Sequence, residues 1–247
     1  MKNLLALLFL FVLLHSCKNN EEPPPLFVKT NTHSIEVKKA TIAPVIDGKP
    51  TDPAWENLNW IGVLNKWQGA DTNLMMNYKL LWTPDALFVL VQLENLTLHP
   101  NLGNPLEHYY SEDNLSIYLD EDNSGGDYTN SYNAFEYKIL PSNFTVRLDP
   151  DKKPLTANNA IHSALKKYGN TYYWELKIAA FDASYQPNTP NEPVSLKLGK
   201  LIGFALAFEK VNAKEPHTIY GSVTIPEDYE GRIAIDAGLF GTLKLIQ

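Results

Sequence analysis

Oxygen-bearing side chains are concentrated in one short segment, Asp120-Glu121-Asp122-Asn123-Ser124-Gly125-Gly126-Asp127. Carboxylate and amide oxygens at alternating positions of a flexible glycine loop suit a hard cation such as Ca²⁺, which takes oxygen ligands. The sequence therefore predicts a structural calcium ion held by Asp120, Asp122 and Asp127. The alternative is a solvated turn between two strands, because Asp, Asn and Gly are also the residues that turns prefer.

A second group of carboxylates, Glu107, Glu112 and Asp113, precedes this segment. A pair of carboxylates can hydrolyse a glycosidic bond, but the sequence does not set the separation of these three. The chain has no P-loop, GxGxxG, HExxH or GxSxG motif and no Cys/His cluster with metal-ligand spacing. With 21 Lys and Arg against 28 Asp and Glu, the net charge of −7 argues against nucleic acid as a partner.

The single cysteine, Cys17, closes an apolar leader that starts with Met1-Lys2-Asn3. The apolar run from Leu4 to Leu14 is short for a membrane span and is typical of a secretory signal. Leu14-His15-Ser16-Cys17 resembles a bacterial lipobox, in which the cysteine carries lipid after cleavage. Two or three acyl chains would anchor the protein stably without spanning the membrane. The alternative is an ordinary secretory signal.

These features divide the chain into a lipoprotein signal peptide (1–16), an acylated cysteine with a flexible tether (17–33) and one domain (34–247). The tether is polar and proline-rich, so it buries too little apolar surface to fold. Its Glu21-Glu22 pair is similar to the signal that sends some Gram-negative lipoproteins to the outer face of the outer membrane. We expect an outer-membrane lipoprotein that faces either the periplasm or the cell surface.

The domain has the periodicity of strands, in short β-branched and aromatic runs bounded by Asn, Asp, Gly and Pro. The predicted strands are Ile35 to Lys39, Asn77 to Trp82, Leu87 to Glu94, Asn114 to Asp120, Ala134 to Leu140, Phe144 to Leu148, Ile161 to Tyr168, Tyr172 to Ile178, Ile202 to Glu209 and Phe240 to Ile246. The one helical signal is a turn at Pro53 that Asp52 can cap. This pattern predicts an all-β fold, an antiparallel, jelly-roll-like β-sandwich, with a closed barrel as the alternative.

Five short motifs follow one another along the domain: Ala43 to Trp55, Leu81 to Val91, Glu112 to Asp120, Ile202 to Leu206 and Phe240 to Leu245. Asp47-Gly48 favours a turn, and Trp55 has the apolar body to close one end of a core. In order and spacing the motifs resemble those of carbohydrate-binding module family 9. The resemblance covers nearly the whole mature domain. It implies a β-sandwich that binds sugar while a separate domain performs cleavage.

Sugar binding needs flat aromatic faces for stacking and polar groups that fix the hydroxyls. In sugar-binding members of the resembled family, two tryptophans sandwich a terminal sugar. The resemblance places Tyr110 at the first, with Tyr109 beside it, and Ile233 to Asp236 where the second would stand. The family's arginine falls at Glu136, and Tyr132 and Asn133 are further candidate contacts. The implied partners are a polysaccharide or oligosaccharide and a neighbouring glycoside hydrolase or outer-membrane importer.

Two other classes of function compete with sugar binding. Related sandwiches carry haem, and Met75-Met76 together with one of the histidines could supply axial ligands, although the chain has no CxxCH motif. The second alternative is a structural or protein-interaction lipoprotein that uses an exposed Trp60 or Trp67 as its contact surface. We expect calcium as a structural ion and no organic cofactor.

Overall fold

The computed structural model describes residues 33–100, 103–187, 189–211 and 217–247. The predicted signal peptide, Cys17 and the tether up to residue 32 lie outside the described residues. Within the described ranges, none of the helices has the length and the apolar character needed to cross a membrane.

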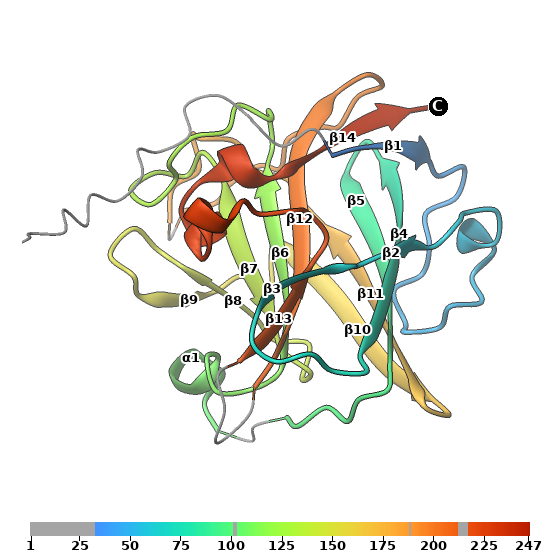
Figure 1. Ribbon diagram of the computed structural model, residues 1–247. Coiled ribbons are helices and arrows are strands. Elements are labelled where there is room, and N and C mark those ends of the chain that lie inside the picture. Colours follow the sequence, from blue (N-terminus) through green and yellow to red (C-terminus); the bar gives the residue numbers. More distant parts are fainter. Residues whose placement is uncertain (1–32, 101–102, 188, 212–216) are drawn as a thin grey trace, which may run out of the picture.

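Strands are the main regular structure of the described residues, which also include one short α-helix and four single 3₁₀ turns (Figure 1). The strands are β1 (Ser34–Lys39), β2 (Ile61–Gly62), β3 (Asn65–Gln68), β4 (Met75–Thr83), β5 (Ala86–Glu94), β6 (Asn114–Asp120), β7 (Phe135–Ile139), β8 (Thr145–Leu148), β9 (Pro154–Thr156), β10 (Ile161–Tyr168), β11 (Thr171–Ile178), β12 (Leu201–Lys210), β13 (Thr218–Gly221) and β14 (Gly241–Ile246). The helices are α1 (Pro105–His108), η1 (Pro53–Trp55), η2 (Glu227–Tyr229), η3 (Arg232–Ala234) and η4 (Ala237–Leu239). Each of the ten predicted strands is therefore confirmed, with small shifts at the ends.

The strands form one hydrogen-bonded path, β10-β11-β5-β4-β1-β14-β12-β6-β7-β8-β9, that folds into two facing layers (Figure 1). β13 pairs with β12 and β3, and β2 pairs with β4. The main core lies between the layers, because Val89 and Val91 of β5 share a cluster with Ile117 of β6 and Leu206 and Phe208 of β12. The predicted all-β sandwich is confirmed.

Strand β1 departs from the predicted antiparallel pattern. It runs parallel to β14, with Ile35 opposite Leu243, and parallel to β4, with Lys38 opposite Leu81. The other pairs among the described strands are antiparallel. Because β1 bonds to one strand of each layer, it joins the two halves of the sandwich into a mixed sheet.

The segment from Asp47 to Trp55 closes one end of the layer that contains β4, β5 and β11. Trp55 is fully buried and its Nε1 donates to Glu175 Oε1 of β11 at 2.9 Å. The other oxygen, Oε2, accepts the backbone N–H groups of Asp47 at 3.0 Å and Gly48 at 2.7 Å. The cap on η1 is also as predicted, since Asp52 Oδ1 accepts from Ala54 N at 2.9 Å. Both parts of the sequence motif thus bind the buried carboxylate of Glu175, and Lys79 Nζ adds a bond to the carbonyl of Trp55 at 2.8 Å, so the segment is a structural plug.

A second, smaller core places the chain between β13 and β14 on the outside of the β6-β12 layer. Tyr118 of β6 and Ala205 and Ala207 of β12 pack there against Ile233 and Phe240. Apolar side chains on both faces of β6 and β12 explain why these strands read as nearly continuous apolar runs, as expected for strands that are covered on both sides. The covering segment, 222–240, forms one side of the candidate site.

Candidate functional site

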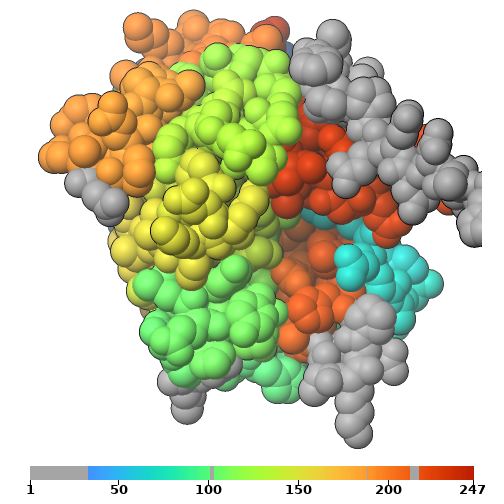
Figure 2. All heavy atoms as spheres, turned by 90° about the vertical axis from the view of Figure 1, so that its left-hand side faces the viewer, coloured from blue at the N-terminus to red at the C-terminus, as the bar shows by residue number. Residues whose placement is uncertain are grey.

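A cleft lies over the outer face of β6, β7 and β12. Figure 2 shows the hollow between β3 (cyan), the stretch after residue 222 (red) and the β8-β9 hairpin (yellow). The cleft has a volume of about 290 Å³ and is lined by Trp67, Gln68, Tyr118, Glu136, Lys138, Glu209, Ile219, Ile225, Gly231, Ile233 and Ala234. A neighbouring outer hollow of about 460 Å³ shares Trp67, Ile225 and Gly231 with it, so the two form one continuous groove.

Trp67 forms the aromatic wall of the cleft. It projects from β3, which pairs with β13, and its Nε1 donates to the carbonyl of Val223 at 2.8 Å. The indole lies directly on Gly221, where a Cβ atom would come within 2.0 Å of the ring. Its ring centroid is 6.1 Å from that of Tyr118. A backbone hydrogen bond and a close glycine therefore hold a half-buried indole at the edge of the groove.

The floor of the cleft is a network of charged side chains. Lys138 of β7 lies between two carboxylates, with its Nζ 3.0 Å from Glu209 Oε2 and 3.5 Å from Glu136 Oε1. Tyr118 Oη donates to Glu136 Oε1 at 3.2 Å. Asn114 Nδ2 donates to Glu209 Oε2 at 3.1 Å, and His217 Nδ1 contacts the other oxygen of Glu209.

Burial shifts the pKa of all three groups, and for Glu209 and Lys138 the neighbouring charges and hydrogen bonds outweigh it. Burial raises the pKa of the Glu209 carboxyl, while Lys138 and the hydrogen bonds from Asn114 and His217 lower it, and the net shift is below its usual value. Burial lowers the pKa of Lys138, yet Glu136 and Glu209 hold it above its usual value. Burial, followed by the charge of Glu136, raises the pKa of Tyr118 well above its usual value. At neutral pH the floor therefore presents fixed charges and a neutral phenol.

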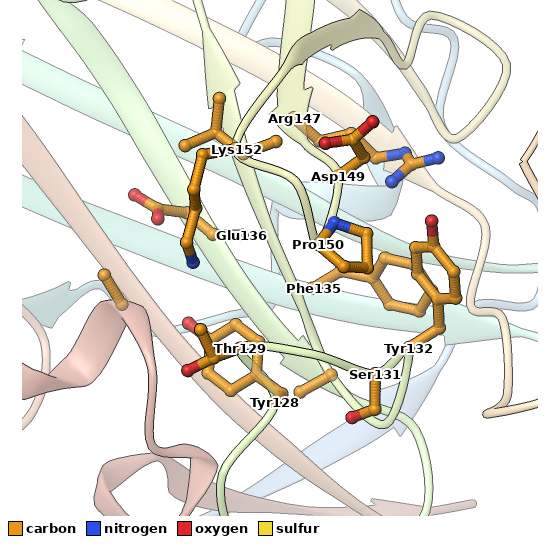
Figure 3. A pocket seen from close by; sticks show the side chains of 13 residues that line it. Tyr128, Thr129, Ser131, Tyr132, Phe135, Glu136, Arg147, Asp149, Pro150 and Lys152 are labelled. Atoms are coloured by element: carbon orange, nitrogen blue, oxygen red, sulfur yellow. The ribbon is translucent and has the colours of Figure 1, made fainter.

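A side cavity of about 50 Å³ opens next to the cleft and shares Glu136 and Ala234 with it. Figure 3 shows its lining: Tyr128, Thr129, Ser131, Tyr132, Ala134, Phe135, Glu136, Arg147, Leu148, Asp149, Pro150, Lys152 and Ala234. Arg147 of β8 is 5% exposed, and its guanidinium lies over the rings of Tyr132 at 5.3 Å and Tyr185 at 4.8 Å.

The structure separates the predicted sugar contacts into three places. Glu136 lies on the cleft floor, and it lines the side cavity together with Tyr132. Tyr109 and Tyr110 follow α1 and meet edge to face at 5.5 Å, with Tyr110 58% exposed, and neither lines the cleft or the side cavity. Asn133 is tied to the glycine loop, because its Nδ2 donates to the carbonyl of Gly125 at 2.9 Å.

Sequence reasoning did not place Trp67, Lys138 or Glu209 in the site. Trp67 was noted only as an exposed tryptophan, since the short strand that carries it lacks a clear alternating pattern. Lys138 gives no signal of its own, because it occupies an ordinary polar position of an alternating strand. It lies opposite Ser116 of β6. Glu209 was assigned simply to the end of a strand. Lys138 could have been predicted from the sequence, because it lies two residues after Glu136 and therefore on the same face of the strand.

The three predicted calcium ligands are engaged within their own loop. Asp120 is buried and its Oδ2 accepts from Gly125 N at 2.8 Å. Asp122 accepts from Ser124 N at 3.0 Å, and Asp127 accepts from Thr129 N at 2.7 Å. Across the described parts of the chain, no three His, Cys, Asp or Glu side chains come together as a possible metal site. The structure therefore does not assemble the predicted trio, and calcium stays a prediction.

The carboxylates considered for hydrolysis do not meet in the cleft. Asp113 is 1% exposed and its Oδ2 lies 2.5 Å from Lys210 Nζ, while its Oδ1 accepts from Val211 N at 2.9 Å. Glu112 is buried as well, whereas Glu107 is exposed on α1 and accepts from Asn104 Nδ2 at 2.8 Å. Asp113 thus ties the end of β12 to the start of β6, which is a structural task.

Comparison with known proteins gives one family and a common fold. The family described as "Carbohydrate family 9 binding domain-like" matches residues 46–247. A solved carbohydrate-binding module family 9 domain from Caldicellulosiruptor kristjanssonii, in complex with cellotriose, is 22% identical over 86% of this chain and 93% of its own, with a TM-score of 0.59. A carbohydrate-binding module family 9 domain from the same organism in complex with glucose is 22% identical over 86% of this chain and 95% of its own, with a TM-score of 0.59.

A putative carbohydrate-binding protein from Bacteroides uniformis ATCC 8492 is 9% identical over 86% of this chain and 99% of its own, with a TM-score of 0.58. No curated protein sequence matches the chain. At these identities the solved structures establish the fold, and the family match covers most of the domain.

Proposed function

Because the chain belongs to the carbohydrate family 9 binding domain-like family, we propose that it binds a polysaccharide or oligosaccharide, without cleaving it, in the cleft between Trp67 and the floor of β6, β7 and β12. Solved members of this fold from Caldicellulosiruptor kristjanssonii were obtained with cellotriose and with glucose. Neither the haem alternative nor the protein-interaction alternative receives support from the comparisons.

The observation that carries the proposal is the arrangement of Trp67 opposite Glu136, Lys138 and Glu209. A pyranose has an apolar face that stacks on an aromatic ring and an edge of hydroxyls that bond to charged and planar polar groups. The indole is held in place before any ligand arrives, so little conformational entropy is lost on binding. The continuous groove gives room for more than one sugar residue.

The test is a glycan array, followed by calorimetric titration, on the wild type and on Trp67→Ala. We expect Trp67→Ala to weaken binding at least about tenfold, since a stacked aromatic at a binding centre contributes about 2 kcal/mol or more. Trp60→Ala is the matched control, because Trp60 is 37% exposed and does not line the cleft. Equal affinities for both variants and the wild type would place the ligand elsewhere, and Tyr110→Ala would then test the rim predicted from the sequence.

We further propose that lipid on Cys17 holds the domain at the outer membrane, where it serves a glycoside hydrolase or an importer. The support comes from the lipobox-like stretch before Cys17 and the polar tether after it. Metabolic labelling with a palmitate analogue tests the anchor: the wild type should incorporate label, and Cys17→Ala should not. Intact-cell protease accessibility then distinguishes the surface from the periplasm, and crosslinking on the preferred glycan identifies the neighbouring enzyme or importer.

A further inference from the structure

The side cavity contains two cationic side chains without an ion-pair partner. Arg147 is nine-tenths buried, its Nη2 donates to Tyr185 Oη at 3.2 Å, and its Nη1 has no hydrogen-bond partner. Among the described residues, neither Arg147 nor Lys152 lies within ion-pair distance of a carboxylate. Arg147 is the buried one of the two, and a buried cation without a counter-charge costs free energy, so its position is unusual in a part of the protein that serves packing alone. Lys152 lines the cavity as an exposed residue.

The carboxylates near the cavity are already engaged. Glu136 faces Lys138 and the hydroxyl of Tyr118 in the cleft. Asp149 accepts the backbone N–H of Lys153 at 2.8 Å, within the turn that joins β8 to β9. Figure 3 shows Lys152 reaching from this turn across the cavity toward Tyr128, on the opposite side of Pro150 from Arg147. The cavity walls therefore offer donors from both sides and a hydroxyl from Thr129 or Ser131.

We propose that this side cavity receives an anionic substituent, a carboxylate or a sulfate ester, of the glycan bound in the cleft. The inference rests on the proposed function and narrows its substrate class to acidic glycans. The cavity and the cleft share Glu136 and Ala234, so a sugar residue over the floor has a direct path for such a group. The guanidinium of an arginine matches the oxygens of carboxylate and sulfate better than a neutral hydroxyl does.

An anionic ligand is compatible with the protein's net charge of −7, because the carboxylates of Glu136 and Asp149 are already paired with other groups. Long-range repulsion between the protein and an acidic glycan is screened at physiological salt beyond about 8 Å, whereas a contact inside a cavity is screened much less. Local pairing with Arg147 and Lys152 therefore decides the preference at the site. Association should be slower at low salt, but the bound state should retain its charge preference at physiological salt.

The test compares ligands that differ only in charge. A galacturonic acid oligomer, its fully methyl-esterified form, a sulfated galactan oligomer, a neutral cello-oligomer and inorganic sulfate are titrated into the purified full chain at physiological salt. We expect an acidic oligomer to bind about tenfold more tightly than its neutral counterpart, which is the effect of one hydrogen bond to a charged group. The carboxylated and sulfated arms identify which anion the cavity prefers, and inorganic sulfate shows whether the anion alone suffices.

Two variants tie the preference to the cavity. Lys152→Gln should reduce the ratio of acidic to neutral affinity about threefold, as expected for an exposed charge pair, and Arg147→Lys tests the guanidinium while keeping the charge. Lys153→Gln is the matched control, because Lys153 is exposed on the same turn and does not line the cavity. An unchanged ratio in Lys152→Gln, with far-ultraviolet circular dichroism showing a native fold, overturns the proposal.

The outcome also separates this inference from the function on which it rests. If neutral and acidic oligomers bind equally, the anion proposal is wrong while glycan binding stands. If no oligomer of either kind binds, the proposed function itself fails. If inorganic sulfate binds but acidic oligomers do not, the cavity is an ion site without connection to a glycan, and the proposal is wrong.

Discussion

At the scale of single residues, the cleft floor depends on Glu209, whose carboxylate has three polar neighbours. Its pKa lies below the usual value, so its contribution to stability is present above that usual value and is lost as the pH falls through the folded-state pKa. We predict that Glu209→Gln lowers the free energy of unfolding by about 2 kcal/mol at pH 7. The loss should be smaller at an acidic pH below the folded-state pKa, where the wild-type carboxylate also becomes protonated.

Urea unfolding of both proteins at the two pH values measures this difference. Glu107→Gln is a suitable control, because Glu107 is exposed on α1 and has a single polar contact, with Asn104. An equal loss at pH 7 and at that acidic pH would mean that the side chain acts through packing and not through charge.

Single residues also show how far the sequence reaches. Glu136 was found through a position in a family motif, and the structure places it on the floor. Trp67 required the pairing of β3 with β13, which brings residues 65–68 next to 219–221 across a long stretch of chain. Side chains that meet through such pairing have no local sequence pattern, because neither strand records the identity of its partner.

At the scale of elements, the plug from Asp47 to Trp55 is held to β11 by Glu175. Trp55→Phe keeps most of the apolar ring but removes the indole N–H that donates to Glu175 Oε1. We predict a loss of about 1 to 3 kcal/mol, since a buried carboxylate oxygen loses a hydrogen bond. Urea unfolding measures it, and Trp60→Phe, at a 37% exposed position, should change stability by no more than about 0.5 kcal/mol. A loss as small as that of the control would mean that the hydrogen bond from Trp55 Nε1 to Glu175 Oε1 does not contribute to stability.

The loop between β6 and β7 gives a second prediction at this scale. Calcium remains a prediction there, with Asp120, Asp122 and Asp127 as its ligands, and each of the three accepts a backbone N–H of the loop. Calcium added to chelator-treated protein should raise the melting temperature, by the equivalent of about 3 kcal/mol at a hundredfold excess over the dissociation constant. Asp122→Asn and Asp127→Asn should each reduce that shift. A melting temperature that does not respond to millimolar calcium would assign the loop to its own backbone hydrogen bonds.

Elements also mark the boundary between the predictable and the unpredictable parts of the fold. Long strands such as β6 and β10 were identified with their full bounds, because alternation and β-branched composition are local properties. The short strands β2, β3, β9 and β13 were missed, since two to four residues carry too little periodicity. The parallel pairing of β1 was missed as well, because strand direction within a sheet depends on distant partners.

At the scale of the whole molecule, β1 links the two layers and its Val37 belongs to the shared core. Val37 is 1% exposed and stands opposite Leu245 of β14. Trp55, Trp82 and Trp174 are all buried around the β4-β5-β11 layer, so tryptophan fluorescence reports mainly on that layer, while far-ultraviolet circular dichroism reports on both. A core shared by the layers predicts one cooperative transition, with the two signals changing together.

Val37→Ala tests whether the two layers unfold together, because Val37 lies in β1, the strand that joins them, and not in the interior of a single layer. We predict a loss of about 2 kcal/mol from the transfer and cavity costs, seen equally by fluorescence and by circular dichroism in urea. Val45→Ala is the matched control, since Val45 is 65% exposed and the same truncation should have little effect there. If the variant's fluorescence transition instead stayed in place while its circular dichroism split into two steps, the layers would be separate folding units. The cleft, which lies on the β6-β12 layer, would then lose its ligand in the step in which that layer alone unfolds.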